Sequence, residues 1–325
     1  MKRLSVVGLL FSLLLLVGAV LAPGAARRSL VYHWPVKPFD RQHPIRGAFG
    51  DPRTFVKRQP FGVTRPYDSG DYSFHSGIDI VALAGAPVYP VVSGRVIKAR
   101  GHEISIACNG KRVFQYFHLR GNVELGEKVV AEQTVIGWIQ HPWNHVHLTE
   151  IDHHHERNPL ARGHLEPYAD HTTPHAIALD FDNGLWPRLT GGGRLSRSDS
   201  LAIAAIDEPA MRVPGSFAGL PQTPALVEWR LHSGHHWSRW HVAADFRKTV
   251  PIRRDYWDVY AAGTYQNSPV FERRLYQGIA GMYLFRVNLH ASRLPAGTYE
   301  IEAKVSDVRG NSSHTTWPLE IRGGS

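Results

Sequence analysis

Three short motifs in the first half of the chain carry the residues best suited to chemistry. His75 and Asp79 stand four residues apart, and His118 follows a Tyr-Phe pair. His145 and His147 stand two residues apart, so in a strand both side chains project from the same face. Catalytic zinc commonly takes three nitrogen or oxygen ligands from the protein and keeps one position open. Two histidines and one aspartate meet that count, and two further histidines remain for proton transfer and charge stabilisation.

Each motif alone is weak support, because the chain holds 20 histidines. A second HxH occurs at His153–His155, and a second HxxxD runs from His241 to Asp245. A solvated or hydrogen-bonded side chain is the ordinary expectation for any single histidine. The order of the motifs and the residues around them must therefore decide between a site and coincidence.

The surroundings of the motifs form a family pattern. Glycine-containing segments and an Asn-Pro-Leu sequence accompany the histidines in order: Gly77, Gly85-Ala86-Pro87, Ser93-Gly94, Gly126, Gly137 and Asn158-Pro159-Leu160. Over about residues 46–162 the chain resembles the lysostaphin-like (LytM-type) zinc metallopeptidases, which hydrolyse bacterial cell walls. The resemblance implies zinc as the cofactor and the peptide cross-links of peptidoglycan as the substrate.

Carried over by position, the resemblance implies that His75, Asp79 and His147 bind zinc. His145 and His118 would be the catalytic pair. We assign proton transfer to His145 and stabilisation of the oxyanion to His118, although the two roles could be exchanged. All five positions are retained, whereas some relatives that lack ligands are inactive binders or regulators. Residues 140–144 (Gln-His-Pro-Trp-Asn) depart from the small residues usual before the HxH, which leaves the cleft shape and the substrate preference open.

Other candidate residues have two interpretations each. Tyr116 either lines the cleft or packs in the core. Glu150 lies on the strand face opposite His147 and either orients a neighbouring group or has no part in the site. His153–His155 is a first binding site for metal or a solvated loop. Cys108 is the single cysteine, which excludes an intrachain disulfide and a multi-cysteine metal cluster, and we expect a buried thiol.

The beginning of the chain predicts export. A short basic start, an apolar run from Leu4 to Leu21 and the small residues of 22–26 together have the form of a signal peptide, with an uncleaved membrane anchor as the alternative. No cysteine follows closely, so a lipoprotein anchor is excluded. We expect the protein in the cell envelope or outside the cell, with membrane contact only if residues 1–26 are retained.

The remaining pattern predicts an all-β protein with two domains. Residues 27–45 read as an extended lead-in, residues 46–170 as an antiparallel β-sheet domain, which the resemblance makes a metallopeptidase domain, and residues 176–325 as a β-sandwich. Residues 296–299 and 306–311 resemble immunoglobulin-like modules, so we expect this sandwich to be immunoglobulin-like. Short β-type runs fill the first domain, and Asn109-Gly110 predicts a hairpin between residues 104–108 and 112–119. In the second domain residues 227–232 and 299–306 alternate apolar with polar side chains. Gly191–Gly193 is expected to be a hairpin tip.

Charge and aromatic residues suggest partners. The net charge of +9 favours anionic surroundings without being a signature of nucleic-acid binding, so we expect no nucleic-acid partner. The basic residues Arg253, Arg254, Arg273 and Arg274 either hold the protein on anionic wall polymers or form a solvated face. Trp237 and Trp240 are either a carbohydrate platform or packed aromatics. The alternative to a peptidase is a non-catalytic envelope protein that binds wall peptides or regulates another wall hydrolase, and a third possibility is a zinc hydrolase of a secreted protein.

Overall fold

The computed structural model describes residues 30–56, 70–109, 111–182, 189–196, 200–267 and 281–322. Residues 31–325 form one compact unit. The predicted signal peptide or anchor of residues 1–26 lies outside the described residues. None of the helices in the described ranges has the length and apolar character needed to cross a membrane.

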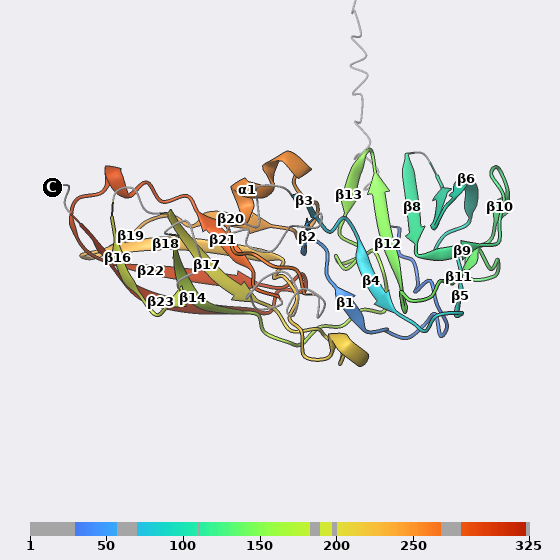
Figure 1. Ribbon diagram of the computed structural model, residues 1–325, viewed down its shortest axis with the longest axis horizontal. Coiled ribbons are helices and arrows are strands. Elements are labelled where there is room, and N and C mark those ends of the chain that lie inside the picture. Colours follow the sequence, from blue (N-terminus) through green and yellow to red (C-terminus); the bar gives the residue numbers. More distant parts are fainter. Residues whose placement is uncertain are drawn as a thin grey trace, which may run out of the picture. The chain divides into compact units, whose positions relative to one another are not determined.

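The first group of strands builds the sheet that carries the histidine motifs (Figure 1). Its order is β1 (Ile45–Gly47), β4 (Ile78–Val81), β12 (His145–Asp152), β8 (Arg112–Phe117), β7 (Glu103–Ala107), β6 (Gly94–Arg100) and β10 (Lys128–Val129), and β13 (His155–Arg157) pairs with β12. A smaller sheet has the order β5 (Pro87–Val88), β11 (Gly137–Ile139) and β9 (Leu119–Gly121), and β2 (Pro52–Val56) pairs with β3 (Gly70–Phe74).

The local predictions for this group are largely confirmed. Strands β7 and β8 pair antiparallel on either side of the predicted turn at residues 109–110. The short strand β5 lies at the edge of its sheet and ends before Pro90, which has no N–H to donate to a ladder. The lead-in packs against the rest of the unit, since Tyr32, Trp34 and Val36 are buried and Tyr32 forms an isolated parallel β-bridge with Leu165.

The second group of strands forms two further sheets. One has the order β15 (Leu189–Thr190), β14 (His175–Asp182), β17 (Ser200–Ile206) and β21 (Leu284–Val287). The other has the order β16 (Gly193–Leu195), β23 (Ser312–Ile321), β22 (Gly297–Ser306), β18 (Leu226–Ser233) and β19 (His236–Trp237), and β20 (His241–Asp245) pairs with β18. The described helical segments are short: η1 (Gly215–Phe217), η2 (Arg253–Asp255), α1 (Tyr256–Val259) and η3 (Ala291–Arg293). The all-β class is therefore confirmed.

The alternating pattern is confirmed in β18 and only in part in β22, where Glu302 and Ser306 are buried as well, and one turn prediction is wrong. Val227, Trp229 and Leu231 are buried while the residues between them are partly exposed. Residues 191–193 are not a hairpin tip, because β15 pairs with β14 whereas β16 pairs in parallel with β23. The glycines therefore carry the chain from one sheet to the other.

The two groups of strands share buried contacts. The ring of Phe74 lies 5.7 Å from that of Phe246 and 5.8 Å from that of Tyr260, centre to centre. The hydroxyl of Tyr260 donates to the carbonyl of Gly50 at 2.8 Å. Gly50 has φ +93°, and a Cβ there would lie 2.5 Å from the Phe246 ring, so the backbone approaches this ring as only glycine allows.

Candidate metal centre

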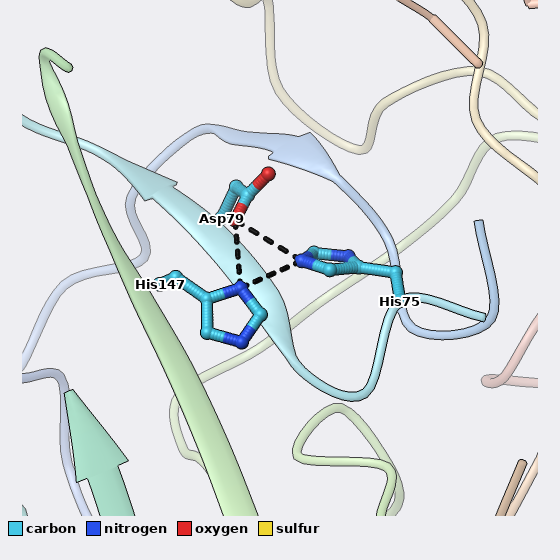
Figure 2. A group of neighbouring side chains, drawn as sticks. All are labelled: His75, Asp79 and His147. Carbon is cyan, nitrogen blue, oxygen red and sulfur yellow. Dashed lines mark hydrogen bonds and ion pairs between the residues drawn. The ribbon is translucent and has the colours of Figure 1, made fainter. Parts of the chain in front are cut away.

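His75, Asp79 and His147 bring three ligand atoms together, as Figure 2 shows. Nε2 of His75 lies 2.7 Å from Nδ1 of His147. Both nitrogens face Oδ1 of Asp79, at 3.1 Å and 3.0 Å respectively. In the described part of the chain, this is the one group of at least three His, Cys, Asp or Glu side chains that could hold a metal ion.

Strand pairing and one glycine position these side chains. Asp79 on β4 is the direct partner of His147 on β12, so both side chains leave the same face of the sheet. His75 lies just after β3, and the chain then passes close to β12. A Cβ on Gly77 would lie only 2.2 Å from the carbonyl oxygen of Leu148, which explains why the sequence between His75 and Asp79 contains glycine.

Hydrogen bonds behind the ligands orient both imidazoles. Nδ1 of His75 donates to the carbonyl of Ala48 at 2.7 Å, so its Nε2 presents a lone pair. Nε2 of His147 lies 2.8 Å from Oγ1 of Thr149, and donation to this hydroxyl leaves Nδ1 free as a ligand. Such contacts are typical behind metal-binding histidines.

The donor set fits zinc. With bonds of about 2.0–2.1 Å in a tetrahedron, zinc holds its donors about 3.3 Å apart. The three donor atoms here lie 2.7–3.1 Å apart, and small movements would bring them to that spacing. His75 and Asp79 are buried and His147 is nearly so.

Two arginines hold the other oxygen of Asp79. Nη2 of Arg53 lies 3.0 Å from Oδ2 and Nη2 of Arg46 lies 3.6 Å from it, so Oδ1 remains for the ligand group. Burial raises the pKa of Asp79, but the charges of His75 and His145 and hydrogen bonds from the histidines outweigh it, and its pKa lies well below the usual value. Burial, with the charge of Arg53, lowers the pKa of His75 to about 3, so this imidazole is neutral near pH 7.

His145 lies beside the ligand group without belonging to it. Its Nε2 is 3.7 Å from Oδ1 of Asp79 and accepts a hydrogen bond from Nη2 of Arg46 at 3.0 Å. Its Nδ1 donates to the carbonyl of Trp143 at 2.5 Å, which fixes the ring and leaves the lone pair on Nε2. Burial lowers the pKa of His145 to about 4, so the imidazole is neutral near pH 7.

His118 completes the group from the link between β8 and β9. Its backbone has φ 67°, and its ring centre lies 4.5 Å from that of His145. The ring also stacks on Trp143. Burial, followed by the charge of His145, lowers the pKa of His118 to about 3.

The structure brings all five candidate residues into one cleft of about 910 Å³. Sequence reasoning missed other parts of its wall: Arg46, Arg53, residues 213–217, Gln266 and Asn267. No local spacing marks these positions, because they approach the histidines only through long-range contacts. The described lead-in residues 30–44 do not line the cleft.

The remaining candidates lie away from the centre. Tyr116 does not line the cleft: it is buried, and its hydroxyl accepts the N–H of Val91 at 2.8 Å. Glu150 is buried and accepts from the hydroxyl of Tyr32 at 2.6 Å and from His164 at 2.7 Å, so it orients the lead-in and not a ligand. The thiol of Cys108 is partly exposed, contrary to the expected buried thiol.

The partner candidates in the second group of strands also have defined neighbours. Trp237 is 40% exposed and stacks on His232, with Arg230 over its ring, so it is not packed in a core. Arg253 donates to the carbonyl of Tyr72 at 2.9 Å. Arg254 lies 3.6 Å from Asp255, and residues 273 and 274 lie outside the described residues.

Among the comparisons with known proteins, only the search of solved structures found matches. No family model matches the chain, and no curated protein matches it. The catalytic domain of the antimicrobial peptidase lysostaphin from Staphylococcus simulans is 25% identical with a TM-score of 0.24, over 34% of this chain and 89% of that chain. A catalytic-domain mutant of the prophage-encoded M23 protein EnpA from Enterococcus faecalis is 22% identical with a TM-score of 0.23, over 32% and 82%. A chain in the structure of the SpoIIQ–SpoIIIAH pore-forming complex is 22% identical with a TM-score of 0.30, over 41% of this chain and 90% of that chain. These TM-scores are too low to carry an assignment.

Proposed function

We propose that this protein is an exported zinc endopeptidase that hydrolyses peptide cross-links of bacterial peptidoglycan. The observation that carries the proposal is the convergence of five side chains in one cleft: His75, Asp79, His118, His145 and His147. The choice of peptidoglycan rests on the motif resemblance between residues 46 and 162. Export rests on the form of residues 1–26, and the N-terminal residue of the secreted protein would test it.

The proposed roles follow from the contacts of each residue. His75, Asp79 and His147 would hold zinc, which lowers the pKa of a bound water and polarises the scissile carbonyl. Nε2 of His145 carries the lone pair and would take the water's proton and return it to the leaving amine. His118, next to His145, would donate a hydrogen bond to the oxyanion that develops on the carbonyl.

Digestion of purified peptidoglycan tests this function. The purified protein is incubated with zinc or with a chelator, and the released fragments are read by mass spectrometry. We expect new amine termini that disappear with the chelator and in His118→Ala. The variant His154→Ala, in the exposed turn before β13, should remain active. Stoichiometric zinc without any cleavage would contradict the proposal.

One contact favours the alternative of a non-catalytic envelope protein. Arg46 donates to Nε2 of His145 at 3.0 Å and so occupies the atom that catalysis needs as a proton acceptor. A protein of this kind would bind wall peptides or regulate another hydrolase, would show no zinc-dependent turnover and would keep its role in His118→Ala. Wall retention of the purified protein, compared between wild type and Arg254→Gln, tests the separate proposal that basic residues hold anionic polymers.

A further inference from the structure

The two arginines of the cleft differ in how closely carboxylates approach them. Apart from the histidines, its described lining contains Arg46, Arg53 and Asp79 as charged groups. Arg53 approaches two carboxylates, since its Nη2 lies 3.0 Å from Oδ2 of Asp79 and its Nη1 lies 3.7 Å from Oδ2 of Asp51. Arg46 approaches one carboxylate, that of Asp79. Its Nη2 lies 3.6 Å from Oδ2, which is farther than the Nη2 of Arg53. Among the described residues, Nε of Arg46 also has no hydrogen-bond partner although it is buried.

Arg46 is nevertheless held firmly in the cleft wall. Its guanidinium carbon lies 4.2 Å from the ring centre of Phe217, a cation–π distance. Its carbonyl accepts a hydrogen bond from Nδ2 of Asn267 at 2.8 Å. Both partners come from the second group of strands and their connections. A guanidinium fixed before binding loses little conformational entropy when a ligand arrives.

From these contacts we propose that Arg46 determines specificity by binding a carboxylate of the substrate. The guanidinium is positively charged and can donate a charge-assisted hydrogen bond to a carboxylate, and its partial burial strengthens this interaction. Nη2 of Arg46 lies 3.0 Å from Nε2 of His145, so the bound carboxylate would lie beside the reaction centre. The substrate class is thus a peptide with a free carboxylate near the bond that is cleaved. This inference rests on the proposed function for the reaction itself.

Two matched substrates test the inference. Cross-linked peptides isolated from peptidoglycan are used with their carboxylates free or converted to primary amides, and kcat/KM is measured for each. The wild type should prefer the free carboxylates by about tenfold or more, the scale of a charge-assisted hydrogen bond. In Arg46→Gln this preference should fall to within about twofold, and in Arg46→Lys it should be intermediate. Arg120→Gln is the control, because Arg120 lies over Trp138 outside the cleft lining and should leave the preference unchanged.

The preference is a ratio within one variant, so a general loss of activity does not obscure it. Equal rates on the two substrates in the wild type, or an unchanged preference in Arg46→Gln, would overturn the role of Arg46. If neither substrate is cleaved, the proposed function fails. The role of Arg46 is then tested separately by calorimetric titration of the zinc-loaded protein with the same two peptides. Tighter binding of the free carboxylates that is lost in Arg46→Gln supports the inference, and equal binding of both peptides refutes it.

Discussion

The imidazole of His118 stacks on the indole of Trp143, with ring centres 4.2 Å apart and planes inclined by 22°. Trp143 belongs to residues 140–144, where the sequence departs from the small residues usual before the HxH. Its carbonyl also accepts the hydrogen bond from Nδ1 of His145. The departure therefore lies in direct contact with both proposed catalytic histidines, and Trp143, which is 45% exposed, lines the cleft.

Trp143→Ala should lower kcat without removing the metal. Stacking of this kind contributes about 0.5–1.5 kcal/mol, so loss of the support for His118 should reduce kcat by about 2- to 10-fold. Zinc content, measured by elemental analysis, should stay at the wild-type level. The ring contacts of Trp143 are with His118 and His145, and neither is one of the three proposed ligands. Trp138→Ala, outside the cleft lining, is the matched control. An unchanged kcat in Trp143→Ala would show that the stack has no role in turnover.

Gly77→Ala should weaken zinc binding through the backbone alone. The new Cβ would lie 2.2 Å from the carbonyl of Leu148, so the loop of His75 must move away from β12, which carries His147. We expect zinc affinity to fall by about 10- to 100-fold, as for other losses of support behind ligands. Gly85→Ala is the control: a Cβ there would meet nothing within 4 Å, so its strain at φ +86° should cost stability without changing zinc affinity. Competition with a zinc-binding dye measures both variants.

Tyr260→Phe should destabilise the protein as a whole. The variant leaves the buried carbonyl of Gly50 without the hydroxyl that donates to it, which costs about 1–3 kcal/mol in the free energy of unfolding. Because Phe74 packs on Phe246 and Tyr260, urea denaturation should show a single transition for both groups of strands in the wild type and the variant. Two separate transitions, of which the variant shifts only one, would mean that the groups fold independently.

Stability should fall with rising pH because of Asp207. Burial, followed by the charges of Asp170 and Asp307, raises the pKa of Asp207 to about 8. In the unfolded chain an aspartate has its ordinary pKa of about 3.9. The folded state binds more protons than the unfolded state between about pH 4 and pH 8, so this carboxyl lowers the stability progressively over that range.

Asp207→Asn should therefore raise Tm more at pH 8 than at pH 5. The amide oxygen can still accept the N–H of Glu208, which Asp207 holds at 2.9 Å. The control is Asp245→Asn, because the hydrogen bond from Arg247 lowers the pKa of Asp245. That carboxylate contributes stability above about pH 4 and loses it as the pH falls, so its replacement should lower Tm slightly at both pH values. A Tm gain in Asp207→Asn that is equal at pH 5 and pH 8 would contradict the assignment.

The sequence by itself determined the chemistry of the ligand group and the β class. The types of His75, Asp79 and His147 met the donor count of a zinc site, and the order of the motifs, through the resemblance over residues 46–162, marked these three residues among the 20 histidines and many acidic residues of the chain. The alternation in residues 227–232 and the Asn-Gly turn likewise reflect neighbours along the chain, and local sequence determines such features. The sequence did not reveal that residues 191–193 join two sheets, because a pair of strands distant in sequence leaves no local signature.

Only the tertiary structure decided what surrounds those donors. Arg46 and Arg53 reach the carboxylate of Asp79, and Phe217 reaches Arg46 from the second group of strands. The stack of Trp143 on His118 and the burial of Glu150 against Tyr32 are similar cases. Each depends on packing between segments far apart in the chain, and neither residue type nor periodicity records which distant side chains will meet. The fold therefore set the charge and the walls of the cleft and the hydrogen-bond partners of His145.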